Sequence, residues 1–151
     1  MKRKETTKAR PRASTARASP TTAGYSGTPL PKKLGIKPDI TVGLVDAPDG
    51  FEGLVSPIPD GAVLKRQPKK ECDLVIWFTR SASDLRRIRA IAKLAATGLW
   101  IAWPKKASGV PCDMNENDVR RVGLENGLVD YKIAAIDATW AGLKFAHRSK
   151  Q

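Results

Sequence analysis

Apolar residues along this chain gather in short runs, and polar or glycine-containing segments separate the runs. Residues 73–79 (Asp-Leu-Val-Ile-Trp-Phe-Thr) form a continuous β-branched and aromatic run, which is typical of a central strand that is covered on both faces. Residues 51–55 fit one short helical turn. Similar apolar runs predict further strands at residues 40–45, 62–65, 99–103, 132–137 and 143–148.

Two longer segments have the spacing of amphipathic helices. Ser83 is a suitable N-cap, and apolar side chains recur with helical spacing from there until Gly98, which is a suitable helix end. The apolar stripe consists of Leu85, Ile88, Ile91, Ala92 and Ala95. A second helix is predicted to begin after Asn115 or Asn117 and to end near Asn126.

The order of these elements predicts the fold class. Those predicted strands that a helix separates are expected to be joined by right-handed parallel crossovers. The last two strands flank residues 138–142 without a helix, so they are expected to form an antiparallel hairpin. We therefore expect a three-layer, Rossmann-like α/β fold, with a mostly parallel sheet and a C-terminal antiparallel hairpin. Its domain is expected to span residues 28–151.

Residues 1–27 have a different composition from the rest. They hold seven Lys/Arg and one Glu, and residues 1–24 contain no Leu, Ile, Val, Phe or Trp. Because such a segment cannot bury an apolar core, we expect a disordered basic tail. The tail predicts either non-specific binding to the phosphates of nucleic acid or a solubilising segment without a specific partner. Its basic residues are Lys2, Arg3, Lys4, Lys8, Arg10, Arg12 and Arg17.

Composition excludes several other classes. The apolar runs are far shorter than the roughly 20 residues that a membrane span needs, and the N-terminus lacks the apolar core of a signal peptide. A cytoplasmic protein is expected. Cys72, Cys112 and His147 are scattered along the chain, so we expect free thiols and no metal site. No combination of residues predicts a catalytic triad.

The later half of the chain resembles a known fold family. An Asp-Leu-Val-Ile strand at 73–76, a Gly-Leu-Trp-Ile segment at 98–101 and an Asn-Gly-Leu-Val segment at 126–129 occur in order before the hairpin. This order resembles the second half of class I S-adenosylmethionine-dependent methyltransferases, and residues 34–46 resemble their first strand. The resemblance implies a Rossmann-like sheet and a cofactor loop after the first strand.

Four departures from that pattern weaken the cofactor prediction. The loop after Asp46 holds one glycine, where a dinucleotide-binding loop needs three, and Pro48 removes a backbone donor from it. About 26 residues separate Asp46 from Cys72, although one β-α-β unit alone takes about 30. Lys65 and Arg66 stand where the resemblance implies an acidic residue that binds the ribose. We therefore expect no cofactor.

Three further motifs resemble a narrower group. They are Thr-Pro-Leu-Pro-Lys-Lys-Leu-Gly-Ile-Lys-Pro at 28–38, Trp-Pro-Lys-Lys at 103–106 and Trp-Ala-Gly-Leu-Lys-Phe at 140–145. Together they resemble a small bacterial protein family of unknown function. That resemblance covers almost the whole chain after the tail and implies no established activity.

Polar residues follow three of the predicted strands. Because ligands bind outside the carboxyl ends of open parallel sheets, these residues are candidates for an anion-binding site. Ordinary helix caps and solvated surface lysines are the alternative explanation. The candidates are Asp46, Asp49 and Gly50 after the first strand, Thr79, Arg80 and Ser81 after the central strand, and Lys105, Lys106 and Ser108 after the fourth.

The tryptophans are expected to have different roles. Trp100 and Trp103 are three residues apart on a strand and should therefore lie on opposite faces, whereas Trp140 falls in the predicted hairpin turn. There it is expected to cover the sheet edge or to belong to a partner surface.

Taken together, these features favour a non-catalytic binding or regulatory module for an anionic ligand or partner. Two alternatives remain open. One is a minimal S-adenosylmethionine-dependent methyltransferase, and the other is a nucleic-acid-associated protein that acts through its basic tail. The ligand's identity and the oligomeric state have no signal in the sequence.

Overall fold

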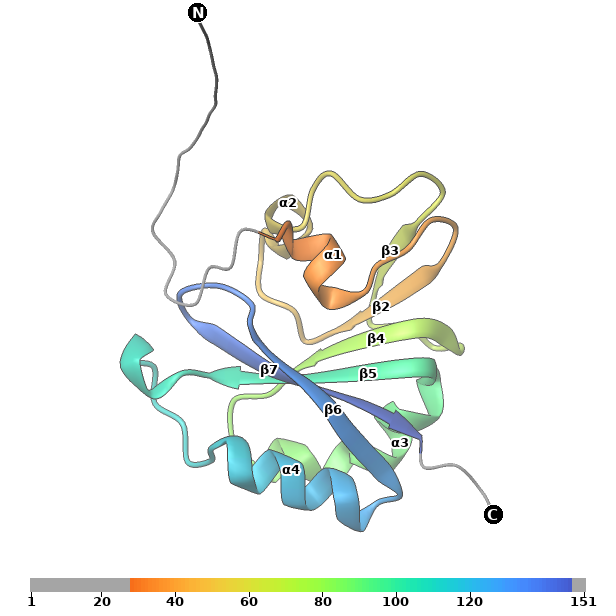
Figure 1. The fold of residues 1–151 in the computed structure, drawn as a ribbon. Coiled ribbons are helices and arrows are strands. Elements are labelled where there is room, and N and C mark those ends of the chain that lie inside the picture. The colour runs from red at the N-terminus through yellow and green to blue at the C-terminus, as the bar shows by residue number, and fades with distance from the viewer. Residues whose placement is uncertain (1–27, 148–151) are drawn as a thin grey trace, which may run out of the picture.

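The computed structural model describes residues 28–147, and within them six strands form one sheet in the order β3-β2-β4-β5-β7-β6 (Figure 1). β3, β2, β4 and β5 run parallel, whereas β7 pairs antiparallel with β5 and β6 pairs antiparallel with β7. The predicted mostly parallel sheet with a C-terminal antiparallel hairpin is confirmed. The strands are β2 (Thr41–Val45), β3 (Val63–Arg66), β4 (Cys72–Phe78), β5 (Ala95–Pro104), β6 (Leu128–Ala135) and β7 (Trp140–His147).

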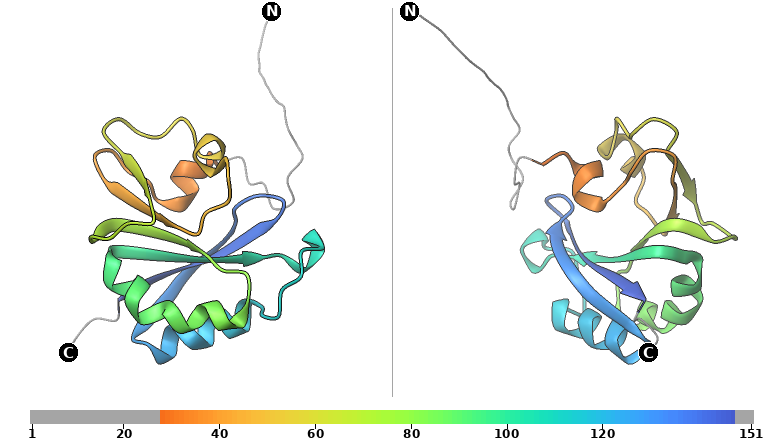
Figure 2. Two further views of the ribbon diagram at one scale, coloured as in Figure 1. Left: turned by 180° about the vertical axis from the view of Figure 1, so that it is seen from behind. Right: turned by 45° about the vertical axis from the view of Figure 1, so that its right-hand side comes forward.

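Helices cover both faces of the sheet. α1 and α2 lie on one side, and η2, α3 and α4 lie on the other, so the predicted three-layer arrangement is confirmed (Figures 1 and 2). No helix among residues 28–147 has the length and apolar character of a membrane span. The α-helices are α1 (Leu30–Leu34), α2 (Phe51–Leu54), α3 (Ile88–Leu94) and α4 (Glu116–Glu125), and the 3₁₀-helices are η2 (Ala82–Arg87) and η3 (Lys106–Ser108).

The larger helical layer packs on the face that contains Trp77 and Trp103. α4 begins at Asn115, one of the two predicted caps, where the Asn115 side chain accepts a hydrogen bond from the Asp118 backbone and the Asp118 carboxylate accepts one from the Asn115 backbone. Such caps stabilise a helix by about 1 kcal/mol. Gly123 faces the ring of Phe145 so closely that any β-carbon there would overlap the ring. The helix therefore approaches the sheet closely at this point.

The opposite face is covered by the part of the chain that contains α1 and α2. The indole of Trp100, which is fully buried, donates a hydrogen bond of 2.8 Å to the carbonyl of Leu34 at the end of α1. Trp100 and Trp103 belong to different core clusters, which confirms that they lie on opposite faces. α1 itself was not expected from the sequence, which predicts only a connection into the first strand.

The helix predicted between Ser83 and Gly98 is wrong at both ends. Its first part is the 3₁₀-helix η2, which begins after Ser81 and has no side-chain cap. Its last residues belong to β5, because Ala95 pairs with Cys72 and Gly98 continues the ladder along β4. Pairing with a buried central strand thus overrides the helical spacing of the apolar residues.

The turn of the hairpin is also shifted from its predicted position. β7 already begins at Trp140, and the backbone amides of Thr139 and Trp140 both donate to the Asp137 carboxylate at 2.8 Å. Trp140 is only 7% exposed and packs edge-on against Phe78, with ring centroids 5.0 Å apart. The prediction that Trp140 covers an edge or belongs to a partner surface is therefore wrong, because the indole fills the core.

Candidate functional site

The side of the sheet on which the next strand is added reverses between β2 and β4. The chain continues from β2 to β3 on one side, and β4 adds on the other side, so β2 and β4 flank the switch point of this sheet. Ligands of open α/β sheets bind in the crevice outside the carboxyl ends of the strands at such a point. Here that position lies between the loop that follows Val45 and the segment that follows Phe78.

Asp46 joins the two borders of this switch point. Its carboxylate forms an ion pair of 2.7 Å with Arg87 of η2, and its carbonyl accepts a hydrogen bond of 3.1 Å from Arg80. Its backbone amide donates to the side chain of Gln67, which follows β3. Asp46 has a positive φ of 56°, a conformation that non-glycine residues seldom adopt outside special sites. The residue is held from three directions in this conformation.

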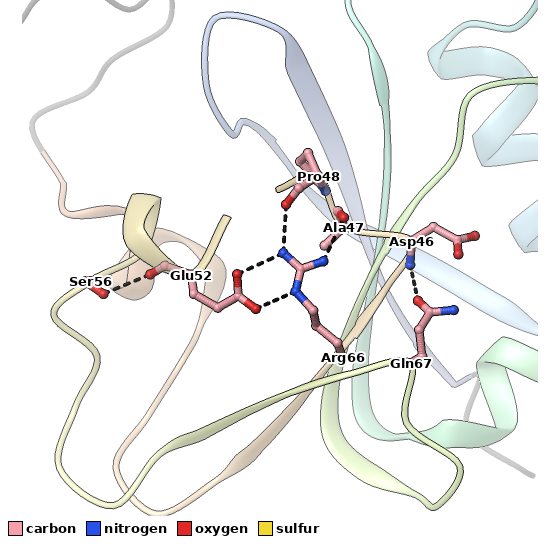
Figure 3. A network of polar contacts seen from close by, with 7 residues as sticks. All are labelled: Asp46, Ala47, Pro48, Glu52, Ser56, Arg66 and Gln67. Carbon is pink, nitrogen blue, oxygen red and sulfur yellow. Dashed lines mark hydrogen bonds and ion pairs between the residues drawn. The ribbon is translucent and has the colours of Figure 1, made fainter. Parts of the chain in front are cut away.

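Arg66 holds the loop after β2 from the side of β3 (Figure 3). Its guanidinium forms two hydrogen bonds with the Glu52 carboxylate, at 2.6 and 2.8 Å. It also donates to the carbonyls of Ala47 and Pro48, at 2.9 and 2.8 Å. All of these bonds come from one planar group, so Arg66 fixes the loop relative to the end of β3.

The hydrogen bonds between these two side chains alter their acidity. They hold the pKa of the Glu52 carboxyl below its usual value and raise the pKa of Arg66 above its usual value. Glu52 is also tied within α2, because its carbonyl accepts a hydrogen bond of 2.8 Å from the Ser56 hydroxyl. The end of β3 carries Lys65 and Arg66, as the sequence indicates, yet Arg66 brings the carboxylate of Glu52 to that end.

Arg80 lies between the loop and the aromatic core. Its guanidinium carbon is 5.2 Å from the centre of the Trp140 ring, a cation–π arrangement. Trp140 in turn contacts Phe78, and Phe78 contacts Phe51 at the start of α2, with centroids 5.0 Å apart. The floor beneath Arg80 is therefore aromatic, and it is continuous from β7 to α2.

The remaining residues predicted after β4 face elsewhere. Thr79 is fully buried, and its hydroxyl donates a hydrogen bond of 2.7 Å to the carbonyl of Ala102. It acts inside the core, so a direct contact with a ligand, as predicted, does not fit this arrangement. The hydroxyls of Ser81 and Ser83 bind each other at 2.8 Å.

Asp49 and Gly50 are exposed in the loop after β2, as expected of ligand-facing residues.

Of the three residues predicted after β5, only Lys106 lines a second hollow. The Ser108 hydroxyl donates to the Lys105 carbonyl at 2.6 Å within η3, and Lys106 lines a cavity of about 530 Å³. Asp113, which lines this cavity, accepts a hydrogen bond of 2.6 Å from the Ala82 amide at the start of η2. The predicted site therefore divides into two neighbouring parts. Other residues that line the cavity are Trp103, Cys112, Asp113, Met114 and Asn115.

Sequence reasoning missed three residues of the switch point, namely Glu52, Gln67 and Arg87. Each reaches the site from a different element, and their partners are 14 to 41 positions away in the chain. Only a folded sheet brings such residues together, so no local spacing indicates them. The basic residues predicted to act in the tail, from Lys2 to Arg17, lie outside the described residues, and that prediction stays a prediction.

Neither a family model nor a curated protein matches this chain. Solved structures do match it in fold. Magnesium protoporphyrin IX methyltransferase from Synechocystis PCC 6803 with bound SAM is 13% identical, with a TM-score of 0.51 over 80% of this chain and 74% of that chain. A SAM-dependent methyltransferase from Aquifex aeolicus is 11% identical, with a TM-score of 0.55 over 76% of this chain and 85% of that chain.

A third match carries no methyltransferase name. It is a protein of the NADB-Rossmann superfamily from Streptococcus agalactiae, 10% identical, with a TM-score of 0.52 over 81% of this chain and 68% of that chain. The resemblance to the small bacterial family of unknown function stays a prediction, because no comparison tests its three motifs.

These comparisons correct the main functional expectation. The expected non-catalytic module for an anionic ligand is wrong, because solved structures named as S-adenosylmethionine-dependent methyltransferases match the fold over about three quarters of the chain. In architecture, this chain has the Rossmann-like fold of the class I methyltransferases.

Proposed function

We propose that this chain is a minimal S-adenosylmethionine-dependent methyltransferase that binds its cofactor across the carboxyl ends of β2 and β4. One observation carries the proposal: Asp46 at the end of β2 is joined to both Arg80 and Arg87, which follow β4. Charged groups of both signs thus meet at the switch point of the sheet, where ligands of this fold class bind.

The charges at this point fit the cofactor. S-Adenosylmethionine carries a sulfonium, an ammonium, a carboxylate and a ribose diol. Asp46, Asp49 and Glu52 are acceptors for the ammonium and the hydroxyls, and Arg80 and Arg87 are donors for the carboxylate. Glu52 substitutes for the acid that the sequence lacks at the end of β3. The cofactor, when bound, supplies a methyl group on a positively charged sulfur.

Two features limit the strength of binding. The loop after β2 has one glycine with left-handed backbone, Gly50, and Pro48 cannot donate a backbone hydrogen bond. Arg66 also occupies both oxygens of Glu52, so the ribose hydroxyls must compete with this ion pair. We therefore expect micromolar rather than nanomolar affinity.

The acceptor of the methyl group belongs in the neighbouring cavity of about 530 Å³ beyond β5. Its lining combines the indole of Trp103 with the charged side chains of Lys106 and Asp113. The link between Asp113 and Ala82 connects the lining of this cavity to the segment that carries Arg80 and Arg87. An acceptor there lies outside the carboxyl ends of the strands, on the same side as the proposed cofactor.

Calorimetry of the full chain with S-adenosylmethionine and with S-adenosylhomocysteine tests the proposal. We expect heat of binding for both ligands. Binding should be about tenfold weaker for Asp46→Asn, because this variant loses the ion pair with Arg87. Glu71→Gln is the matched control, since Glu71 is an exposed acid at the amino end of β4. Absence of heat at millimolar cofactor with the unchanged chain would contradict the proposal.

A further inference from the structure

A second charged surface lies at the opposite edge of the sheet, where β6 and β7 meet the end of α1. The Lys132 ammonium donates a hydrogen bond of 2.7 Å to the Lys33 carbonyl, and the Lys144 ammonium donates one of 3.3 Å to the Leu34 carbonyl. The Lys33 ammonium donates at 3.2 Å to the Ala135 carbonyl on β6. Three lysines thus converge on a junction of backbone carbonyls.

These lysines lack acidic partners. Among the residues at 28–147, no ion pair is formed by Lys33, Lys132 or Lys144. Burial lowers the pKa of Lys144 first, and the nearby charges of Lys132 and Lys37 lower it further. Like charges therefore lie close enough to repel one another, and an anion bound at this surface relieves that repulsion.

An exposed aromatic ring stands beside the lysines. The pairing of β6 with β7 shifts register between Asp130 and Lys132, and Tyr131 falls in the irregularity. Its side chain is 57% exposed, which is unusual for an aromatic residue on a strand. The Lys144 ammonium lies 5.7 Å from the centre of this ring and 5.8 Å from that of Trp100. The ring is thus held in place while much of it stays open to solvent.

A cavity of about 480 Å³ adjoins this edge, between α1 and β6. Lys32, Lys33 and Lys132 line it together with Thr28. Thr28 follows directly on the 27 residues that hold seven Lys/Arg and one Glu, so the most basic stretch of the sequence enters the fold at this cavity. Three lysines thus line one hollow within the described residues.

We propose that this surface, made of Lys32, Lys33, Lys37, Tyr131, Lys132 and Lys144, binds single-stranded nucleic acid. Proteins that bind single strands combine a basic groove for the phosphates with an aromatic side chain on which a base stacks. The lysines and the cavity provide the first, and Tyr131 provides the second. A flexible strand can follow a concave hollow, which a flat acidic bilayer cannot enter.

This inference goes beyond the proposed methyl transfer and does not depend on it. The residues of this surface lie on β6, on β7 and in or just after α1, whereas the charged residues of the switch point follow β2, β3 and β4, so the two surfaces share no charged residue. A substitution on one surface therefore leaves the other intact. The nucleic acid is a ligand of the β6 edge whether or not it also accepts a methyl group.

Fluorescence anisotropy of a labelled 12-nucleotide single-stranded RNA with the full chain tests the inference. We expect charge reversal in Lys132→Glu to weaken binding about tenfold, and Tyr131→Ala to weaken it by a similar factor while Tyr131→Phe preserves it. Lys93→Glu is the matched control, because Lys93 is an exposed lysine on α3, on the opposite face of the sheet. It should change the affinity less than twofold if only local charge matters.

A second pair of variants distinguishes RNA binding by this surface from RNA binding by residues 1–27. In a full-length variant in which the seven Lys/Arg of residues 1–27 are replaced by Gln, RNA binding should persist and stay sensitive to Lys132→Glu. Loss of all binding in that variant, or equal affinities for Lys132→Glu and Lys93→Glu, overturns the inference. Binding to vesicles of acidic lipid without binding to RNA overturns it as well.

Discussion

The two charged regions of this protein differ in whether their charged side chains form ion pairs. At the ends of β2 and β4, arginines and carboxylates are paired with each other, as in Arg66–Glu52 and Arg87–Asp46. At the edge of β6, lysines gather without acidic partners and donate to backbone carbonyls instead. Paired charges fix the shape of a site, whereas unpaired charges of one sign attract a ligand of the other. We therefore expect the first region to be specific and the second to be strongly salt-dependent.

The largest effect should come from reversing two lysines at once. Lys37→Glu combined with Lys132→Glu should weaken RNA binding about a hundredfold at low salt, because each reversal replaces an attraction to phosphate by a repulsion. Binding of S-adenosylmethionine by the same variant should be unchanged. Anisotropy and calorimetry on one preparation measure both affinities, and a parallel loss of both would show that the two regions are not separate.

An intermediate effect should come from releasing the loop after β2. Arg66→Gln removes the bonds to Glu52, Ala47 and Pro48, so we expect faster hydrogen exchange across residues 46–54 and about fivefold weaker cofactor binding. Mass spectrometry of deuterated peptides measures the exchange. Arg120→Gln is the matched control, since Arg120 is an arginine on α4 that forms ion pairs with two carboxylates, those of Glu116 and Asp130, away from this loop. Equal exchange of the loop in both variants would refute the role given to Arg66.

The smallest effect should be a dependence on pH above neutrality. The pKa of Lys144 is lowered in the folded chain, so its unfavourable charge is present below that pKa and disappears as the pH rises through it. Stability should therefore increase from the lowered pKa up to the ordinary value of lysine, while RNA affinity falls over the same interval. Titration of both between pH 7 and about 10.4 measures this.

Lys144→Arg is the control for the pH dependence, because arginine stays charged over this interval. The variant should show neither the rise in stability nor the early fall in RNA affinity. If the fall in affinity is the same in both chains, other lysines cause it, and Lys144 has no part in binding.

The sequence was most informative where the local pattern and the tertiary environment agree. The apolar run of β4 predicts a central strand, and β4 lies between two parallel neighbours. The pattern misled where they disagree. Residues 95–98 continue a helical stripe, yet pairing with β4 makes them a strand. α1 has only five residues and contains Pro31, so it leaves almost no periodic signal.

The candidate site was less predictable than the fold. Asp46 and Arg80 follow strands, and that position alone indicates them. The partner of Arg66 is 14 residues away, and the partner of Arg87 is 41 residues away, so both pairs depend on strand order. The sequence has no acidic residue at the end of β3, as noted above. In the folded chain, Glu52 of α2 supplies a carboxylate at that place.

The most direct test of the proposed function is a titration of the isotope-labelled full chain with S-adenosylmethionine, followed through the backbone amide resonances. The proposal predicts saturable shifts in the loop of residues 46–52 and in residues 79–87, the two segments that Asp46 joins. It also predicts that the amides of β6 stay unchanged. Unchanged resonances in both segments at millimolar cofactor, or saturable shifts confined to the β6 edge, would contradict it.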